Sequence, residues 1–425
     1  MKAALARAAY ALLLWVLAPF YLARLGWRGR AEPLYRLALA ERFGHTGRNT
    51  THGRVWIHAV SLGETLAAQA LVEEIRAAEP DVQILLTHGT ATGRQAGQGL
   101  LRPGDAQAWL PYDTPGATRR FLRQQQPAVG VLMETEVWPN LLHQAQDLGV
   151  PMVLANARLS QRSLRKGQRA SLLMRPALAS FKAVLAQTED DAQRLLQMGA
   201  QTVEVVGNLK FDLTPDSALL ALGRAWRDML SGRPVVLMAS SRAGEEAPLL
   251  AAWQGLPAPR PLLLLVPRHP QRFDEVAALV AASGLALQRR SAWGGSPPAS
   301  AARADVWLGD SVGEMPLYYA VAQAALLGGS FEPLGGHNLI EAAACGCPLV
   351  MGPHTFNFEQ AAERSLAAGA AWRAGSLPEG VQRAVAVATD PQHSRLVEHA
   401  LAFAAQHRGA ARRMAKQVLL LRAAR

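Results

Sequence analysis

The chain has few of the residues and spacings that mark metal, disulfide or hydrolase-triad proteins. Its 425 residues include only two cysteines, Cys345 and Cys347, and their C-x-C spacing suits neither a zinc site nor a disulfide framework. We expect both to be small buried residues in a reducing compartment. No Asp-x-Asp and no His-Glu-x-x-His occurs, so the sequence predicts no metal site and no cofactor. No Ser-His-Asp order can be singled out either.

Acidic residues are also outnumbered, which leaves a formal net charge of +11. Such an excess usually reflects an anionic partner: nucleic acid, a membrane surface or an acidic substrate. Nucleic-acid binding would favour basic patches interleaved with aromatic residues, or a recognisable module, and the sequence has neither. The arginines gather instead in residues 24–42 and 158–175. We therefore predict an anionic membrane surface, and no nucleic acid, as a partner.

Long hydrophobic runs are absent except for residues 8–22, AAYALLLWVLAPFYL, which Arg7 precedes and Arg24 follows. The basic residues after the run argue against a cleaved signal peptide. The run is shorter than the ~20 apolar residues of a full span, and Trp15 and Tyr21 suit a membrane interface. We predict an anchor at residues 1–30 on the inner face of a membrane, which either spans the bilayer or lies on it. Residues 34–43, with Arg42, read as an amphipathic helix, on the membrane surface or simply solvated.

After this helix, short apolar runs alternate with helical patterns, which is typical of parallel sheets covered by helices on both faces. The expected strands are residues 55–60, 83–87, 129–133, 151–155, 183–186, 203–206, 235–239, 261–266, 305–308, 324–327 and 349–351. Pro215 and the sequence SGRP at residues 231–234 interrupt the pattern. The predicted fold class is α/β, with Rossmann-like, doubly wound domains at residues 31–215 and 216–425 that share a cleft. A C-terminal helix is expected to cross back.

The most informative stretch is residues 324–353, AALLGGSFEPLGGHNLIEAAACGCPLVMGP. A buried strand leads into a loop with four glycines at residues 328–338, and a helix begins with Asn338 as N-cap and Glu341 three residues later. Loop amides and the positive end of a helix hold phosphate in many α/β proteins. The spacing matches neither the dinucleotide fingerprint nor the P-loop. A glycine-rich turn without a ligand is the alternative.

Charged side chains follow several predicted strands, where ligands of such sheets bind. Glu64 opens a helix and either stabilises its N-terminus or acts as a general base. Glu134 and Glu136 share one face of a strand end and either hold a polar acceptor or pair with nearby arginines. Arg268 lies in a proline-flanked segment that suits a phosphate or carboxylate. Lys210 is by default an exposed structural lysine.

The ordered motifs of this chain resemble those of one enzyme family. The runs HAVSLGET, METEVWPNLL, ANARLS, GNLKFD, VPRHPQRF, VGEM and GGSFEPLGGHNLIEAAACGCPLVMGPHTFNF are similar to those of the Kdo transferases, the 3-deoxy-D-manno-octulosonic acid transferases of lipopolysaccharide assembly. The resemblance covers roughly residues 34–358. It implies a GT-B fold and an inverting, metal-independent transfer of Kdo from CMP-Kdo to lipid A precursor. It also implies a location at the cytoplasmic face of the inner membrane.

The same resemblance implies roles for individual residues. Glu64 matches the catalytic base of the family. The segments that match its CMP-binding residues are Pro267, Arg268, Val312, Gly313, Glu314, Asn338, Leu339, Ile340 and Glu341. Phosphate or acceptor contacts are expected from Lys210, Ser61, Gly63, Glu134, Glu136, Arg158, Gly336 and His337. Small departures, Asn208 and the pair Arg242-Ala243, fall outside the base and the nucleotide segments.

Two other functions stay open at this point. A GT-B transferase or epimerase with a UDP-sugar would share the fold but not the nucleotide. A membrane-anchored protein that binds nucleotide or lipid without catalysis would share the anchor and the glycine loop. The sequence does not give the number of Kdo residues added, the acylation of the acceptor or the oligomeric state.

Overall fold

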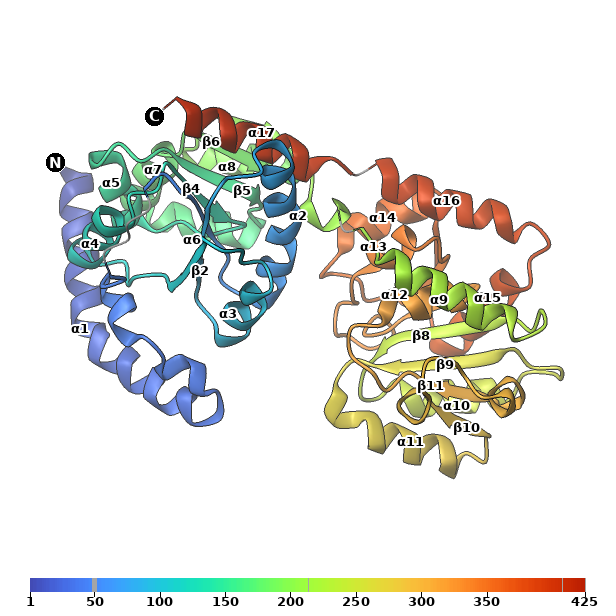
Figure 1. Cartoon of the computed structure of the whole chain (residues 1–425). Helices are drawn as coiled ribbons and strands as arrows, with labels where there is room; N and C mark the ends of the chain where they lie inside the picture. The colour runs from blue at the N-terminus through green and yellow to red at the C-terminus, as the bar shows by residue number, and fades with distance from the viewer. Residues whose placement is uncertain (48–51, 213, 407, 425) are drawn as a thin grey trace. The chain divides into compact units, whose positions relative to one another are not determined.

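The computed structural model describes residues 1–47, 52–212, 214–406 and 408–424, which form two compact units (Figure 1). Unit 1 comprises Met1–Asp212 and Arg408–Arg425, and unit 2 comprises Leu213–His407. The end of the chain thus belongs to unit 1. Its last helix, α17 (Ala410–Ala423), packs on α2 (Leu62–Ala78), and the Asp212 carboxylate accepts a hydrogen bond of 2.5 Å from the backbone N–H of Ala411.

Unit 1 is built on a parallel sheet of seven strands in the order β3-β2-β1-β4-β5-β6-β7. Apolar side chains alternate between its two faces: Val55 and Ile57 pack with α2 and α17, whereas Trp56 packs with helices of the other face. The strands are β1 (Val55–His58), β2 (Ile84–His88), β3 (Ala106–Trp109), β4 (Val129–Met133), β5 (Met152–Ala157), β6 (Ala183–Ala186) and β7 (Val203–Val205). The remaining helices are α1 (Lys2–Ala31), η1 (Pro33–Arg36), η2 (Leu39–Phe43), α3 (Ala91–Gln98), α4 (Pro115–Gln125), α5 (Pro139–Asp147), α6 (Gln161–Arg169), α7 (Ser171–Ala179), α8 (Glu189–Met198) and η3 (Leu209–Asp212).

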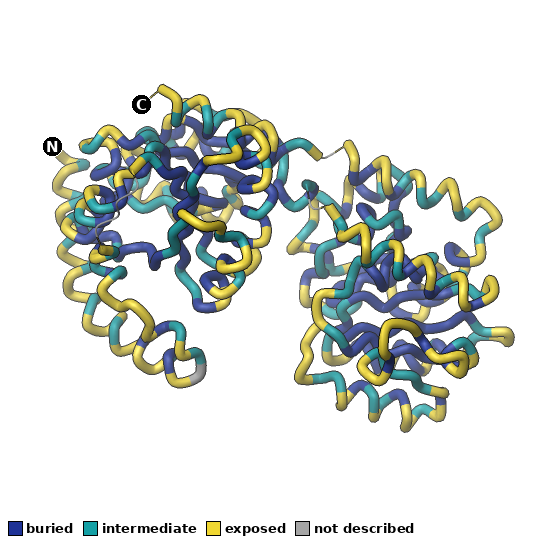
Figure 2. Tube along the Cα trace, in the orientation of Figure 1, coloured by how far each residue is buried: buried dark blue, intermediate teal, exposed yellow. Residues whose placement is uncertain are grey.

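Unit 2 repeats the plan with a second parallel sheet of seven strands, in the order β10-β11-β9-β8-β12-β13-β14. Its strands are β8 (Val235–Ser241), β9 (Leu262–Pro267), β10 (Leu287–Arg289), β11 (Val306–Leu308), β12 (Ala324–Leu327), β13 (Leu349–Met351) and β14 (Ala371–Arg373). Its helices are α9 (Ser217–Asp228), α10 (Glu246–Gln254), η4 (Pro270–Arg272), α11 (Phe273–Ala282), η5 (Arg290–Ala292), η6 (Ala299–Arg303), α12 (Met315–Val321), α13 (Leu339–Ala344), α14 (Glu359–Ala367), α15 (Leu377–Ala388) and α16 (His393–Gln406). Both sheets are buried (Figure 2), which confirms the predicted α/β class with two doubly wound sheets.

The strand order reverses once in each unit, between β1 and β4 in unit 1 and between β8 and β12 in unit 2. Open α/β sheets bind ligands at such switch points, beyond the carboxyl ends of the strands. Helix α2, which carries Glu64 in its first turn, is the next helix after β1, and the glycine loop follows β12. The topology therefore gives each unit one preferred position for a ligand.

All eleven expected strands are confirmed, and β3, β10 and β14 were missed. Each missed strand lies at the edge of its sheet. These three strands, with the sequences AQAW, LQR and AWR, contain polar residues and lack the continuous apolar run that indicates a central strand. Cys347 is buried as expected, whereas Cys345 is only partly buried, and both are free thiols.

Helix α1 is long and apolar enough to cross a membrane, and most of its surface is exposed (Figure 2). It extends beyond the predicted run in both directions. One face nevertheless packs on unit 1. Leu25 is buried in a cluster with Tyr35 and Ala91, and the rings of Tyr21 and Tyr112 meet edge to face, with their centroids 4.7 Å apart.

The prediction of one amphipathic helix over residues 34–43 is wrong. Two short 3₁₀ helices, η1 and η2, occupy this stretch because Ala38 adopts a left-handed conformation with φ of 50° between them. Arg42 lies neither on a membrane surface nor in solvent. Its side chain is buried, and the guanidinium carbon lies 4.1 Å from the centroid of the Trp109 ring.

Candidate functional site

Glu64 lies in the first turn of α2, at the switch point of unit 1. Ser61 is the N-cap of this helix; its Oγ accepts from the Glu64 N–H at 3.4 Å and donates to Glu64 Oε1 at 3.0 Å. Glu64 Oε2 accepts a hydrogen bond of 2.8 Å from the backbone N–H of Val60. The side chain thus completes a variant of the capping box. Each carboxylate oxygen keeps one further lone pair, so a capping role leaves room for a substrate hydroxyl.

The surroundings of Glu64 favour the protonated carboxyl. Burial raises the pKa of Glu64 above its ordinary value, and the charge of Glu134 adds to the increase. The hydrogen bonds from Val60 and Ser61 and the charge of Arg158 lower this pKa but do not cancel the effect of burial. A carboxylate with a raised pKa is a stronger proton acceptor at neutral pH.

Glu134 directly follows β4, and Asn156 is the last residue but one of the neighbouring strand β5; both have strained backbone conformations. Their φ angles are 56° and 52°, in the left-handed region that side chains other than glycine rarely occupy. Glu134 is buried, and its Oε2 accepts a hydrogen bond of 2.8 Å from Arg158 Nε. Pairing with an arginine, one of the two expectations for this residue, is therefore observed. Backbone strain of this kind persists where the surrounding structure holds it, commonly at functional sites.

Within the part of the chain that the structure describes, Glu136 does not pair with an arginine; its Oε2 accepts a hydrogen bond of 2.8 Å from Trp138 Nε1. Burial and the nearby charge of Glu64 raise the pKa of Glu136 to about 7. The fully buried His58 has its Nε2 3.8 Å from Glu136 Oε2. Burial lowers the pKa of His58 to about 3, so the ring is neutral. Because its Nδ1 lies 3.0 Å from the Thr87 carbonyl oxygen, we assign the proton to Nδ1, which leaves Nε2 as a bare acceptor.

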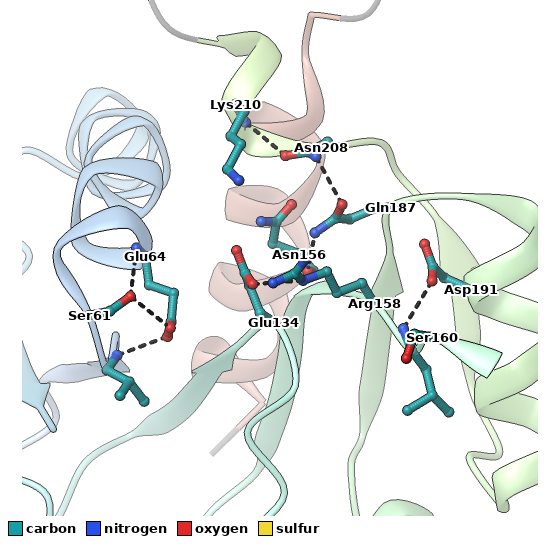
Figure 3. A network of polar contacts seen from close by, with 12 residues as sticks. Ser61, Glu64, Glu134, Asn156, Arg158, Ser160, Gln187, Asp191, Asn208 and Lys210 are labelled. Carbon is teal, nitrogen blue, oxygen red and sulfur yellow. Dashed lines mark hydrogen bonds and ion pairs between the residues drawn. The ribbon is translucent and has the colours of Figure 1, made fainter. Parts of the chain in front are cut away.

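Lys210 is half-buried, so the expectation of an exposed structural lysine is wrong. A chain of hydrogen bonds fixes its backbone (Figure 3). Asn208 Oδ1 accepts from the Lys210 N–H at 3.0 Å, Asn208 Nδ2 donates to Gln187 Oε1 at 2.8 Å, and Gln187 Nε2 donates to the Asn156 carbonyl oxygen at 2.9 Å. Figure 3 shows the side chains of Lys210, Glu64 and Glu134 directed toward a common space. Burial lowers the pKa of Lys210, and the charges of both glutamates oppose this.

Cationic and imidazole side chains gather at the switch point of unit 2. Arg268 follows β9 and is exposed, and Arg242 follows β8. Burial, the charges of Arg268 and Arg242, and the nearby His269 together lower the pKa of His337, in the glycine loop, to about 4, with burial the largest cause. His337 Nε2 is buried without a hydrogen-bond partner in the described parts of the chain. The cluster combines unneutralised positive charge with an unsatisfied polar atom, which suits an anionic ligand.

The glycine loop is held from inside by Glu245, a buried carboxylate that the sequence did not single out. Its oxygens accept hydrogen bonds of 2.8 and 2.9 Å from the Gly329 N–H and of 2.9 Å from the Arg242 N–H. The second amide of the loop is therefore occupied by the protein, and the first, the Gly328 N–H, donates to the Ala239 carbonyl oxygen at 2.9 Å. This corrects the expectation that the loop amides in general converge on a ligand.

Helix α13, which follows the loop, is only six residues long. Asn338 is its N-cap as predicted, and its Oδ1 accepts from the Ile340 N–H at 3.1 Å. Leu339 and Ile340 are buried, so they can offer a ligand only backbone atoms. Burial raises the pKa of Glu341, and the charge of Arg268 partly offsets the increase. Glu341 and Arg268 are therefore close enough to interact.

The segment at residues 312–314 is exposed at its tip and anchored at its base. Val312 is exposed, and Gly313 adopts a φ of 85°. Glu314 is engaged within the chain: its oxygens accept hydrogen bonds of 2.8 and 3.1 Å from Arg290, and a further bond from Ser311. Its carboxylate therefore fixes the turn.

Four residues at these sites could not be read as functional from the sequence alone: Arg242, Glu245, Asn156 and Gln187. Arg242 was set aside as a departure outside the nucleotide segments, yet its charge acts on His337 and His269. The available signal was its position directly after a strand, shared with Arg268. Three further expected contact residues are placed as follows. A Cβ atom at Gly63 would meet no described atom within 4 Å, so the space beside it is open. Gly336 adopts a left-handed φ of 73°, and Pro267 is the last residue of β9. Among the residues described, no group of three or more His, Cys, Asp or Glu side chains is arranged to hold a metal ion.

Comparisons with known proteins agree on one family. A family profile described as "3-Deoxy-D-manno-octulosonic-acid transferase (kdotransferase)" matches residues 38–213. The 3-deoxy-D-manno-octulosonic acid transferase of Bordetella pertussis is 49% identical over 403 residues, which cover 91% of this chain and 93% of the relative. The enzyme of the same name from Haemophilus influenzae is 33% identical over 396 residues, 91% of each chain.

Among solved structures, the UDP-GlcNAc 2-epimerase from Neisseria meningitidis bound to UDP-GlcNAc aligns with a TM-score of 0.56. The alignment covers 88% of this chain and all of that one, at 12% sequence identity. An identity this low establishes the shared two-sheet fold alone.

Proposed function

The chain belongs to the 3-deoxy-D-manno-octulosonic acid transferase family, and on that premise we propose that it transfers Kdo from CMP-Kdo to lipid A precursor in lipopolysaccharide core assembly. The observation that carries the proposal is the half-buried Glu64, oriented by hydrogen bonds from Val60 and Ser61 at the switch point of unit 1. The position is where the fold binds ligands. The raised pKa of Glu64 suits a general base.

In the proposed reaction, a Glu64 oxygen takes the proton from an acceptor hydroxyl. The hydroxyl oxygen then attacks the anomeric carbon of Kdo, and the bond between that carbon and the phosphate oxygen of CMP breaks. The bonding electrons leave with CMP, and the anomeric configuration inverts. Lys210 and Arg158 lie beside Glu64 as positive charges that stabilise its ionised form. Glu134 and Glu136 are proposed to bind polar groups of the acceptor.

Unit 2 is proposed to hold CMP. Arg268 is exposed, and the structure gives its side chain no hydrogen bond or ion pair within the described residues, so its guanidinium can bind the phosphate. Arg242 and His337 would add a cation and a polar contact. Glu341 is proposed to accept hydrogen bonds from the ribose, and the N-terminal amides of α13 to contribute a smaller share. Two arginines would then balance the charge of the departing CMP in place of a metal ion.

Helix α1 is proposed to anchor the chain to the inner membrane, with both units on the cytoplasmic side. Its length and composition are those of a membrane helix, which a cleaved signal sequence can share. The packing of Leu25 against Tyr35 and Ala91 favours the anchor, because cleavage after the helix would expose this cluster. The basic residues after the apolar run would then face anionic lipid headgroups.

The test is a transfer assay with the full-length protein in detergent. The protein is incubated with CMP-Kdo and lipid A precursor, and the lipid product is weighed by mass spectrometry. We expect the lipid to gain the mass of one or more Kdo residues, with release of an equal number of CMP molecules. The same assay with UDP-sugars should give no product. Transfer from a UDP-sugar, or none from CMP-Kdo, would overturn the proposal.

A further inference from the structure

A pocket of about 390 Å³ lies inside unit 1, between α1 and the carboxyl ends of the first strands. Helix α1 contributes an apolar wall that includes Leu14, Leu17 and Leu25. The volume falls in the ~300–1,000 Å³ range of small-molecule sites. Because α1 is apolar on nearly every face, the pocket wall continues directly into the surface that a membrane would cover.

The opposite wall carries polar atoms whose hydrogen-bonding capacity is unused. Nε and Nη2 of Arg42 and the hydroxyl of Tyr112 are buried and have no hydrogen-bond partner among the described residues. Both residues line the pocket, and Arg42 is only 2% exposed. A buried guanidinium with two unused donors is costly unless a ligand accepts from it. Arg24 and Arg28 line the same pocket and add positive charge.

One carboxylate in the wall opposes an anion, but it is already engaged. Asp113 accepts hydrogen bonds of 3.1 and 2.7 Å from the N–H groups of Asn140 and Leu141 at the start of α5. Burial raises the pKa of Asp113 to about 7. It therefore does not present a full negative charge to the pocket at neutral pH. Arg28 Nη2 lies 3.7 Å from Glu32 Oε1, so the positive charge of the pocket comes mainly from Arg24 and Arg42.

The pocket reaches the proposed base. Val60 lines it, and the backbone N–H of Val60 is the donor to Glu64 Oε2 at 2.8 Å. Trp138 also lines it, and its Nε1 donates to Glu136 Oε2 at 2.8 Å. A lipid held in the pocket would consequently present its headgroup beside Glu64.

We propose that this pocket binds the acceptor glycolipid, with an acyl chain along Leu14, Leu17 and Leu25 of α1 and a phosphate on Arg42 and Tyr112. The proposal rests on the proposed function, because it assigns the site of that reaction's acceptor. The occupant is an anionic, acylated sugar lipid. A membrane phospholipid in the same place is the rival outcome of the test.

The phosphate contact is tested with two acceptors, the phosphorylated lipid A precursor and the same lipid after its phosphates are removed. For the wild-type protein, removal of the phosphates should raise the acceptor KM roughly tenfold or more, because a charge-assisted hydrogen bond is lost. Arg42→Gln should raise the KM for the phosphorylated lipid by a similar factor and leave the KM for the dephosphorylated lipid unchanged. The KM for CMP-Kdo should not change. Equal effects on both lipids would overturn the phosphate assignment.

Tyr112→Phe is the second variant, should Arg42→Gln fail to fold. It removes only the hydroxyl and keeps the ring that packs on Tyr21. We expect a roughly fivefold higher KM for the phosphorylated lipid alone, as for the loss of one hydrogen bond to a charged group. No difference between the two lipids would contradict the proposal.

The acyl contact is tested by filling the pocket from α1. Ala18 lines the pocket, whereas the exposed Ala23 on the same helix does not. Ala18→Trp should raise the KM for the acylated acceptor roughly tenfold and leave unchanged that for the deacylated sugar phosphate. Ala23→Trp is the matched control and should change neither. Identical behaviour of the two variants would sink the acyl assignment.

A binding experiment separates this proposal from the proposed function. A photoreactive acyl analogue of the glycolipid should label residues 14–25 and 110–112, and excess unlabelled glycolipid should compete. If phosphatidylglycerol competed with equal potency, the occupant of the pocket would be a bilayer phospholipid, and the proposal would be overturned. If the wild-type protein transferred no Kdo but was labelled and competed as described, the proposed reaction would fail and the glycolipid pocket would stand.

Discussion

The backbone N–H of Val60 and the Glu64 carboxylate are joined by a hydrogen bond of 2.8 Å that serves the fold and the proposed chemistry together. The bond orients Glu64 and helps cap α2, but it also draws electron density from the oxygen that would accept a proton. Burial outweighs this effect on the pKa of Glu64. A substitution can therefore separate the structural role of the side chain from its basicity.

Replacing Glu64 by Gln should abolish most of the transfer activity and leave the stability of the fold nearly unchanged. Glutamine keeps an oxygen that can accept from Val60, and it serves as well as glutamate in a capping box. It cannot take up a proton, so we expect Kdo transfer to fall roughly 10²–10⁴-fold, the usual contribution of a general base. The measurements are kcat for transfer, the thermal midpoint and CMP binding.

The control for this substitution is Glu73→Gln, an exposed glutamate on the same helix. It should leave both kcat and the thermal midpoint unchanged. Near wild-type turnover by Glu64→Gln would remove Glu64 as the base.

The acidic limb of the pH profile of kcat/KM should shift in opposite directions when Glu134 or Arg158 is replaced. Transfer requires ionised Glu64, so kcat/KM falls as the pH drops through its pKa. Glu134 raises this pKa and Arg158 lowers it. Glu134→Gln should therefore shift the limb to lower pH, and Arg158→Gln should shift it to higher pH. Shifts of the same sign would show that another group controls the limb.

Arg268 and Arg272 lie in one segment but should respond differently to the same substitution. Arg268 is exposed and proposed to bind phosphate, so Arg268→Gln should raise the KM for CMP-Kdo roughly 10–100-fold, with no change in stability. Arg272 Nη1 lies 2.6 Å from Oε1 of the buried Glu246. Arg272→Gln should lower the free energy of unfolding by about 3 kcal/mol.

Both variants are measured by steady-state kinetics and by denaturant unfolding. If Arg268→Gln lost stability and kept its KM, the assignment of this residue to the CMP phosphate would be wrong.

Glu136 should make the stability depend on pH. Its pKa rises from an ordinary value of 4.5 to about 7 in the folded chain. The folded state therefore binds more protons than the unfolded state between these values, and stability falls as the pH rises through this window. Glu136→Gln keeps an acceptor for Trp138 but cannot ionise. The thermal midpoint of the variant should fall less than that of the wild type between pH 5 and pH 8, and parallel curves would contradict the raised pKa.

Much of the fold followed from the sequence because central parallel strands are buried on both faces. Runs such as residues 129–133 and 262–267 contain no polar side chain that could face solvent, so their composition requires that they be buried. Glu64, Arg268 and Asn338 stood out by their places beside regular elements: Arg268 directly follows β9, and Glu64 and Asn338 lie at the N-termini of α2 and α13. Three edge strands, β3, β10 and β14, escaped because polar residues interrupt their short sequences, whereas the edge strand β7 was predicted.

What the sequence determined by itself is the order of buried strands, the apolar N-terminal helix and the residues at strand ends, all of which depend on local pattern. Only the tertiary structure decided which of these residues already have hydrogen-bond partners within the protein. Glu314 and Gly329 are engaged by neighbours, whereas Arg42 and Tyr112 are buried with unused donors. Hydrogen-bond satisfaction depends on groups far apart in the chain, such as α1 and the strand ends that it covers. No local pattern records those distances, so the pocket beside Glu64 is visible only in the folded molecule.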